Sequence, residues 1–229
     1  MKTIGLIGGM SWESTLPYYK LLNEGVKQRL GGLHSAKLLL YSVDFAEISA
    51  LQHAGDWDGA ARLLAHAAQQ LQNAGADFLL LCTNTMHKVA PQIEQGLRAP
   101  LLHIADPVAA AIRTRGLQKV ILLGTRFTME ERFYRDRLAQ QGLQVLLPNE
   151  AERQRIHDII YKELCLGVLT AAARTHFQDV IARLVQEEGA QGAILGCTEI
   201  GLVLQSAPVP LFDSMRLHVE AGLEMALAD

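Results

Sequence analysis

Two short polar segments each follow an apolar run that is typical of a buried β-strand. They are Cys82–His87 (Cys-Thr-Asn-Thr-Met-His) and Gly196–Glu199 (Gly-Cys-Thr-Glu). A helix cap would account for only one of the polar side chains after the first strand. Thiols, which titrate near ~8.5 when free, beside hydroxyl, amide and carboxyl groups suit proton transfer. We therefore interpret both segments as candidate catalytic sites.

The elements that must position these segments alternate regularly along the chain. Short β-rich runs end in glycine, proline or a polar residue, and the segments between them have helical periodicity, as in 60–73. Continuous apolar strands alternating with amphipathic helices predict an α/β fold in which parallel sheets are flanked by helices.

The second half of the chain repeats the pattern of the first. Three pairs of segments match in order: 2–8 with 119–124, 78–85 with 193–199, and 99–102 with 209–212. The interval from Gly8 to Thr83 is nearly equal to the interval from Gly124 to Cys197. We predict two pseudo-symmetric domains, 1–115 and 116–229. A C-terminal helix, 215–229, is the segment of the second domain that could pack back onto the first.

In open parallel sheets, ligands bind beyond the carboxyl ends of the strands. Both polar segments lie at such ends. Two equivalent halves with those ends facing would enclose a cleft with a matched group on each wall, which is a layout for chemistry on both faces of one atom. The glycine-rich Gly5–Met10 has the spacing G-x-x-G-G. That spacing differs from the dinucleotide fingerprint and favours a tight turn from strand to helix.

Composition excludes several classes of protein. The formal charge of −3 argues against a general nucleic-acid binder, and no apolar stretch approaches the ~18 residues of a membrane span. Three cysteines (Cys82, Cys165 and Cys197) form neither a disulfide framework nor a spacing typical of metal ligands. Of these, Cys165 lies in the apolar stretch Ile159–Leu169 and is expected in the core. We expect a cytoplasmic protein with no membrane or nucleic-acid partner.

The motifs resemble those of the aspartate/glutamate racemase family, which are cofactor-independent amino-acid racemases. Thr83–His87 is similar to the family's Cys-Asn-Thr-x-His, Gly196–Glu199 matches its Gly-Cys-Thr-Glu, and Ile4–Ser11 resembles its beginning. The likeness covers nearly the whole chain. It implies a two-domain α/β fold with the site between the domains, no pyridoxal phosphate, no metal, a small amino-acid substrate and usually a homodimer.

One position departs from the family pattern. The motif from Asn84 to His87 aligns Thr83, and not Cys82, with the family's first catalytic cysteine. The internal repeat alone would pair Cys82 with Cys197, and the spacing does not settle the choice. Side chains alternate between the faces of a strand, so a shift of one residue would point Cys82 away from the cleft. The resemblance therefore favours Thr83.

By the resemblance, Cys197 and Thr83 interconvert L- and D-forms of an acidic amino acid, aspartate or glutamate. Cys197 is expected to remove the α-proton of the L-form, and Thr83 to return a proton on the other face, directly or through water. Donors near the α-carboxylate would stabilise the carbanion. The expected substrate contacts are Met10, Gln52, Asn84, Thr85, Lys162, Thr198 and Glu199.

Two other functions stay open. A decarboxylase or isomerase of dicarboxylic acids needs only one cysteine, and Thr83 in place of a thiol fits such an enzyme. A non-catalytic amino-acid-binding protein would keep the cleft after losing one base. Carbon dioxide release from a disubstituted malonate would identify the first, and heat stabilisation by L-glutamate or L-aspartate without deuterium uptake would identify the second.

Overall fold

The computed structural model describes residues 1–228, and its chain divides into two compact units. The first comprises Met1–Ile104 with the segment from His218 onward, and the second comprises Ala105–Leu217. The sequence placed the boundary later, after residue 115. The structure places α5 (Ala105–Thr114) in the second unit, where Asp106 accepts two hydrogen bonds, of 2.6 and 2.7 Å, from Arg137 of α7 (Arg132–Gln140). A bidentate pair of this kind fixes α5 against α7.

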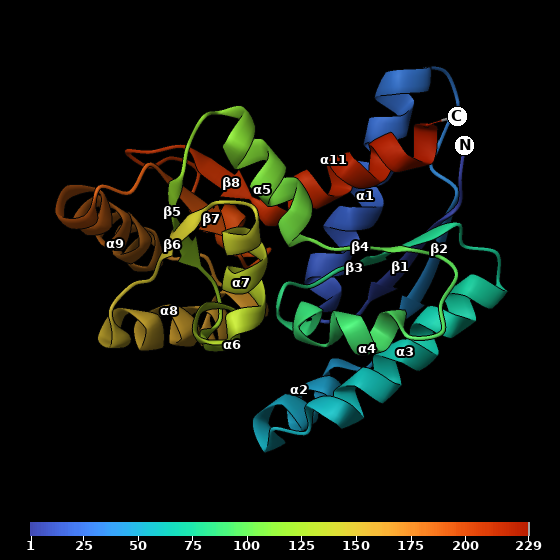
Figure 1. The fold of residues 1–229 in the computed structure, drawn as a ribbon, viewed down its shortest axis with the longest axis horizontal. Coiled ribbons are helices and arrows are strands. Elements are labelled where there is room, and N and C mark those ends of the chain that lie inside the picture. Colours follow the sequence, from blue (N-terminus) through green and yellow to red (C-terminus); the bar gives the residue numbers. More distant parts are fainter. Residues whose placement is uncertain (229) are drawn as a thin grey trace. The chain divides into compact units, whose positions relative to one another are not determined.

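The first unit is built on a parallel sheet in the order β2-β1-β3-β4. Its strands are β1 (Ile4–Gly8), β2 (Leu38–Ser42), β3 (Phe78–Leu81) and β4 (Leu101–Leu102). One face carries α3 (Trp57–Asn73) and α4 (Ala90–Glu94), with α2 (Phe45–Ala54) beside α3, and the other carries α1 (Trp12–Leu30) and α11 (Ser214–Leu227) (Figure 1). Apolar side chains of β1, β3, α3 and α4 form the core on the first of these faces.

A glycine turn joins β1 to α1, as the sequence predicted. Gly9 has a φ of +91°, and a Cβ there would overlap the Val43 carbonyl, so no other residue fits without strain. Ser11 then caps α1 by accepting a hydrogen bond of 3.4 Å from the Ser14 N–H.

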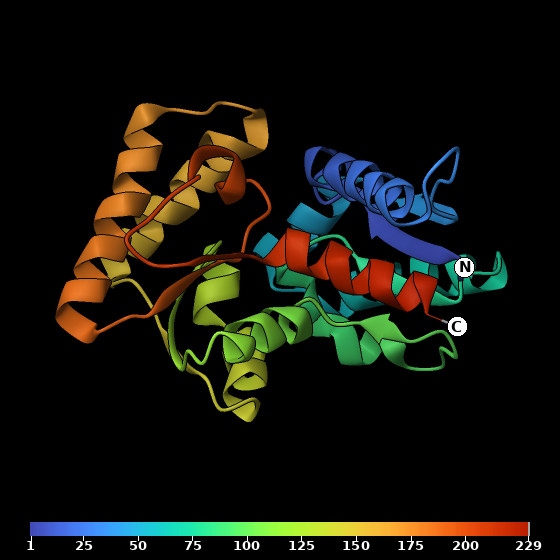
Figure 2. The ribbon, with the colours of Figure 1, turned by 90° about the horizontal axis from the view of Figure 1, so that it is seen from above.

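The second unit has a parallel sheet in the order β6-β5-β7-β8. Its strands are β5 (Lys119–Leu123), β6 (Gln144–Leu146), β7 (Gly192–Leu195) and β8 (Leu211–Asp213). Figure 2 shows α8 (Glu150–Lys162) and α9 (Ala171–Glu188) on one face, and α5 and α7 on the other. Short helices α6 (Arg126–Glu130), η2 (Leu164–Leu166) and α10 (Ile200–Val203) complete the unit.

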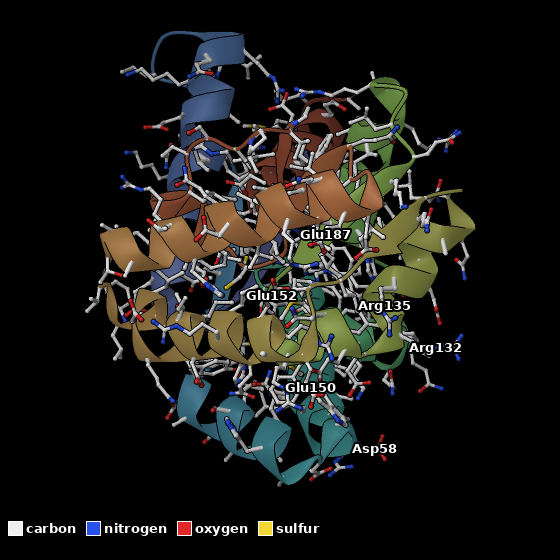
Figure 3. The ribbon with its side chains drawn as sticks, turned by 90° about the vertical axis from the view of Figure 1, so that its left-hand side faces the viewer. Asp58, Arg132, Arg135, Glu150, Glu152 and Glu187 are labelled. Carbon is white, nitrogen blue, oxygen red and sulfur yellow. The ribbon has the colours of Figure 1, made fainter. Side chains whose placement is uncertain are left out.

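An ion pair joins α8 to α9 along their exposed edge. Glu152, which lies on α8 where that helix faces α9 (Figure 3), accepts hydrogen bonds of 2.8 and 2.6 Å from Arg183. Arg183 also pairs with Glu187 of its own helix at 2.7 Å. Partial burial acts to raise the pKa of the Glu152 carboxyl, but the hydrogen bonds and the positive charge of Arg183 hold that pKa below its usual value. The ion pair between Arg183 and Glu152 holds together the two helices that pack on one face of the second sheet, and neither pair of Arg183 involves the candidate site residues.

The two units repeat one topology, which confirms the α/β fold and the internal repeat. Ile7 of β1 lies opposite Leu81 of β3, and Leu123 of β5 lies opposite Leu195 of β7. The pair Ile7–Leu81 is therefore equivalent to the pair Leu123–Leu195, and Gly8 and Gly124 follow Ile7 and Leu123 at equivalent points. Among the helices of residues 1–228, none combines the length and the apolar character that crossing a bilayer requires.

Candidate active site

Thr83 and Cys197 occupy equivalent positions in their respective units. Leu81 is the last residue of β3, and Thr83 is the second residue after it. Leu195 is the last residue of β7, and Cys197 is likewise the second residue after it. The strand register makes Leu81 equivalent to Leu195. Counting from hydrogen-bonded strands thus aligns Cys197 with Thr83, whereas the intervals along the sequence left Cys82 open as the partner.

Cys82 is a buried thiol at the end of β3. It has no exposed surface, its N–H donates to the Ile7 carbonyl at 2.9 Å, and its Sγ lies 3.9 Å from the Leu80 carbonyl oxygen. Burial raises the pKa of this thiol far above its ordinary value. Thr83, one residue later, is only half-buried. Of the two side chains, only Thr83 is open to a ligand.

His87 holds the main chain of Thr83 from within the same unit. Its side chain is almost fully buried, and its Nδ1 lies 2.8 Å from the Thr83 carbonyl oxygen. The other ring nitrogen, Nε2, accepts a hydrogen bond of 3.1 Å from the Ile104 N–H. This side chain belongs to η1 (Thr85–Val89), the 3₁₀ turn that follows the candidate catalytic segment. Its environment supports packing and capping, and not direct chemistry.

Four expected substrate contacts lie in the first unit, and all are buried. Met10 packs in the apolar core, while Asn84 and Thr85 lie at the start of η1. Gln52, on α2, donates from Nε2 to the Met86 sulfur at 2.9 Å. Its Oε1 is buried and has no hydrogen-bond partner among residues 1–228. A buried amide that is half satisfied in this way is suited to a polar ligand.

In the second unit, the Cys197 thiol donates to a buried carboxylate. Its Sγ lies 2.9 Å from Glu199 Oε2, which also accepts a hydrogen bond of 2.6 Å from the Thr198 hydroxyl. Thr198 and Glu199 are buried, and Cys197 is half-buried. The Cys197 thiol and the Thr198 hydroxyl therefore both donate to one carboxylate oxygen, Glu199 Oε2.

The surroundings of Cys197 favour its protonated form. Burial, and then the negative charge of Glu199, raise the pKa of the thiol well above its ordinary value. Cys197 therefore holds its proton at neutral pH, and the nearest group that can accept that proton is the carboxylate bonded to it. A thiolate with such a high pKa is a stronger base once it forms.

Cys165 approaches this cluster and Tyr161 interacts with it electrostatically, and sequence reasoning identified neither as a site residue. Cys165 packs against the second core as expected, yet it is half-buried and its Sγ lies 3.8 Å from Glu199 Oε1. Burial raises the pKa of Tyr161, as do the negative charges of Cys197, Cys165 and Glu199 in their ionised forms.

Lys162 lies apart from the Cys197 cluster. Its side chain is 72% exposed and pairs with Asp158, one turn earlier on α8, at 3.1 Å. The expected contact of Lys162 with the substrate therefore depends on Lys162 leaving Asp158. Within residues 1–228, no group of three or more His, Cys, Asp or Glu side chains is arranged to hold a metal ion.

Comparison with known proteins gives concordant matches over the whole chain. The family model for Asp/Glu/hydantoin racemases matches residues 7–222. A crystal structure of a Yersinia pestis protein assigned as an Asp/Glu racemase is 53% identical, covers 99% of this chain and 100% of its own, and has a TM-score of 0.92. An aspartate racemase homologue from Pyrococcus horikoshii OT3 is 36% identical, with 99% of each chain covered and a TM-score of 0.87. The broad specificity amino-acid racemase RacX of Bacillus subtilis (strain 168) is 24% identical over 98% of both chains.

Proposed function

This chain belongs to the Asp/Glu/hydantoin racemase family and is an isomerase of the amino-acid racemase type, and we propose that it interconverts L- and D-forms of aspartate or glutamate. The observation that carries the proposal is the equivalence of Thr83 and Cys197, which occupy the same position after register-matched strands. Two groups that act from opposite faces of the α-carbon can remove a proton and return one. Neither group then has to move across the substrate.

Cys197 is the proposed base toward the L-enantiomer. Glu199 Oε2 takes the thiol proton across the 2.9 Å hydrogen bond, and the thiolate then removes the α-proton of the substrate. The electron pair of the broken C–H bond passes into the α-carboxylate. Hydrogen-bond donors aimed at that developing charge lower the barrier, and Asn84, Thr85 and Thr198 are the proposed donors.

Thr83 is the proposed proton donor on the D-face. A hydroxyl is a far weaker acid than a thiol, so the return step is the slow one. The proton comes either from Thr83, whose oxygen then regains a proton from solvent, or from a water that Thr83 orients. The half-buried position of Thr83 beside fully buried Cys82 supports this assignment.

Gln52 and Lys162 would bind the side-chain carboxylate of the substrate. A half-turn of the Gln52 amide would present its two N–H groups to a second carboxylate and leave its oxygen toward Met86, where a thioether is only a weak acceptor. Lys162 would add charge after leaving Asp158. Met10, which belongs to the same apolar core as Met86, would offer an apolar contact to the substrate. The homodimer and the cytoplasmic location implied by the resemblance and the sparse cysteines remain predictions.

Incubation in D₂O tests the proposed function. We expect proton NMR to show that L-aspartate or L-glutamate loses its α-proton signal faster than polarimetry shows inversion, because Cys197 exchanges its proton readily and Thr83 returns one slowly. The D-enantiomer should show little exchange ahead of inversion. Equal exchange from both enantiomers would contradict these roles. Carbon dioxide release from a disubstituted malonate, without exchange of either amino acid, would instead favour the decarboxylase.

Substitutions at positions 82 and 83 test the alignment of the first half. Thr83→Ala should nearly abolish inversion, whereas Cys82→Ala should keep most of it. Thr83→Cys should speed inversion and equalise exchange from the two enantiomers, with each tenfold gain corresponding to about 1.4 kcal/mol off the barrier. Inversion rates are to be read beside the melting temperature, because Cys82 is buried. An inactive Cys82→Ala with an active Thr83→Ala would show that the alignment is wrong.

A further inference from the structure

We infer that His87 is a positioning residue for Thr83. It fixes the main chain of Thr83 through a neutral imidazole of defined tautomer and supplies no proton itself. The inference rests on the proposed function, because it concerns the step assigned to Thr83. It goes beyond that function by giving a role to a side chain that the chemistry does not use.

Two hydrogen bonds of the His87 ring indicate which nitrogen carries the proton. A carbonyl oxygen only accepts, so Nδ1, at 2.8 Å from the Thr83 oxygen, carries the proton. A main-chain N–H only donates, so Nε2, at 3.1 Å from the Ile104 nitrogen, is unprotonated. The ring is therefore neutral, and both of its nitrogens are occupied.

The local backbone explains why a side chain does this work. Thr83 N–H bonds the Leu81 carbonyl at 2.8 Å, and the His87 N–H bonds the Asn84 carbonyl at 3.1 Å, so the backbone turns tightly between strand and η1. The imidazole then bonds the Thr83 carbonyl from one turn further on. Through Ile104, the same ring ties Thr83 to the last residue before the chain enters the second unit.

Burial separates this role from acid–base chemistry. His87 is 1% exposed, and its ring packs against those of His103 and His218, with centroids 4.5 and 5.9 Å away. His218 is itself held by the Tyr18 hydroxyl at 2.9 Å and by the Leu102 carbonyl at 2.9 Å. A ring buried in this way is shielded from solvent, and its own hydrogen bonds, not the Tyr18–His218 pair, hold the Thr83 carbonyl.

Two conservative variants test separately the hydrogen bonds of His87 to Thr83 and to Ile104. The amide of asparagine stands near the position of Nδ1, so His87→Asn keeps a donor for the Thr83 carbonyl and loses the acceptor for Ile104. The amide of glutamine stands near Nε2, so His87→Gln keeps the acceptor and loses the donor. Each is compared with the unaltered protein for inversion rate, for deuterium exchange of the L-substrate and for melting temperature.

We expect His87→Gln to slow inversion on the order of 10²-fold, the scale of a misplaced catalytic group, while L-substrate exchange through Cys197 stays within about twofold. His87→Asn should keep the ratio of inversion rate to exchange rate that the unaltered protein has, even where its melting temperature falls as far as that of His87→Gln. Tyr18→Phe removes a buried hydrogen bond from the same cluster without touching Thr83, and it should lower the melting temperature while leaving the ratio unchanged.

Three outcomes would overturn the inference. The first is a ratio of inversion rate to exchange rate that is equal in His87→Gln and His87→Asn, and the second is a ratio that follows the melting temperature across all variants. The third is a lowered ratio in His87→Asn, which contradicts the inference even where His87→Gln does not fold. Absence of exchange from L-aspartate and L-glutamate in the unaltered protein would instead contradict the proposed function. The two failures are therefore distinguishable.

Discussion

Cys197→Ser should lower the rate of both inversion and L-substrate exchange by about 10³-fold or more, the upper part of the range for loss of a general base. The serine hydroxyl is a much weaker acid than the thiol. Glu199, which accepts a hydrogen bond of 2.9 Å from the Cys197 thiol in the unaltered protein, therefore cannot take the proton of the serine. The side chain is half-buried, and serine is the smaller residue, so we expect the fold to remain. Both rates are measured by NMR and polarimetry at one pH.

Cys82→Ala is the matched control for this variant, since it also removes one thiol beyond a central strand. It should retain both rates within the loss that its melting temperature explains. The comparison separates the chemistry of Cys197 from a general need for sulfur in these positions. Full activity of Cys197→Ser would count decisively against a thiolate base.

Glu199→Gln should slow racemisation by about 10²- to 10³-fold while making Cys197 easier to alkylate. The two effects have opposite signs for one reason. The carboxylate accepts the thiol proton, and a neutral amide cannot. The same negative charge raises the pKa of Cys197, so its removal lowers that pKa and moves thiolate formation to lower pH. Burial still raises the pKa in the variant, which limits the shift.

The measurement is the pH profile of inactivation by iodoacetamide, which reacts with the thiolate. In Glu199→Gln the rise in alkylation rate should begin at lower pH than in the unaltered protein. Glu152→Gln is the control, because it removes a carboxylate of the same unit that is bonded to Arg183 and not to Cys197. It should leave the alkylation profile in place. An unshifted profile in Glu199→Gln, or one moved to higher pH, would show that Glu199 does not act on the thiol.

Much of the fold was predictable because it depends on local patterns that recur. Apolar runs ending at Gly8, Leu81 and Leu195 marked strands packed on both faces, and the repeated order of these runs indicated the duplication. The boundary between the units was predicted less well. Nothing in the sequence near residue 105 reveals that Asp106 meets Arg137, because that pair forms only when α5 and α7 pack together.

The site was predictable in its segments and not in its contacts. The nearly equal intervals that precede Thr83 and Cys197 cannot distinguish Cys82 from Thr83, because they include loops of different length, whereas the strand register aligns Leu81 with Leu195. The approach of Cys165 to Glu199 joins residues far apart in the chain. The pairing of Lys162 with Asp158 is local, and its spacing of one helical turn was a readable sign of a solvated side chain.

The division of the chain has a consequence for synthesis on the ribosome. All residues of the second unit, Ala105–Leu217, have been made before the first unit receives its last segment. That segment supplies His218 to Tyr18 and the Ala226 carbonyl to the Lys2 N–H, at 2.9 and 2.8 Å. A nascent chain folds as its residues emerge. The second unit can therefore complete its fold before the first unit, which cannot complete its own until the C-terminal segment has been made.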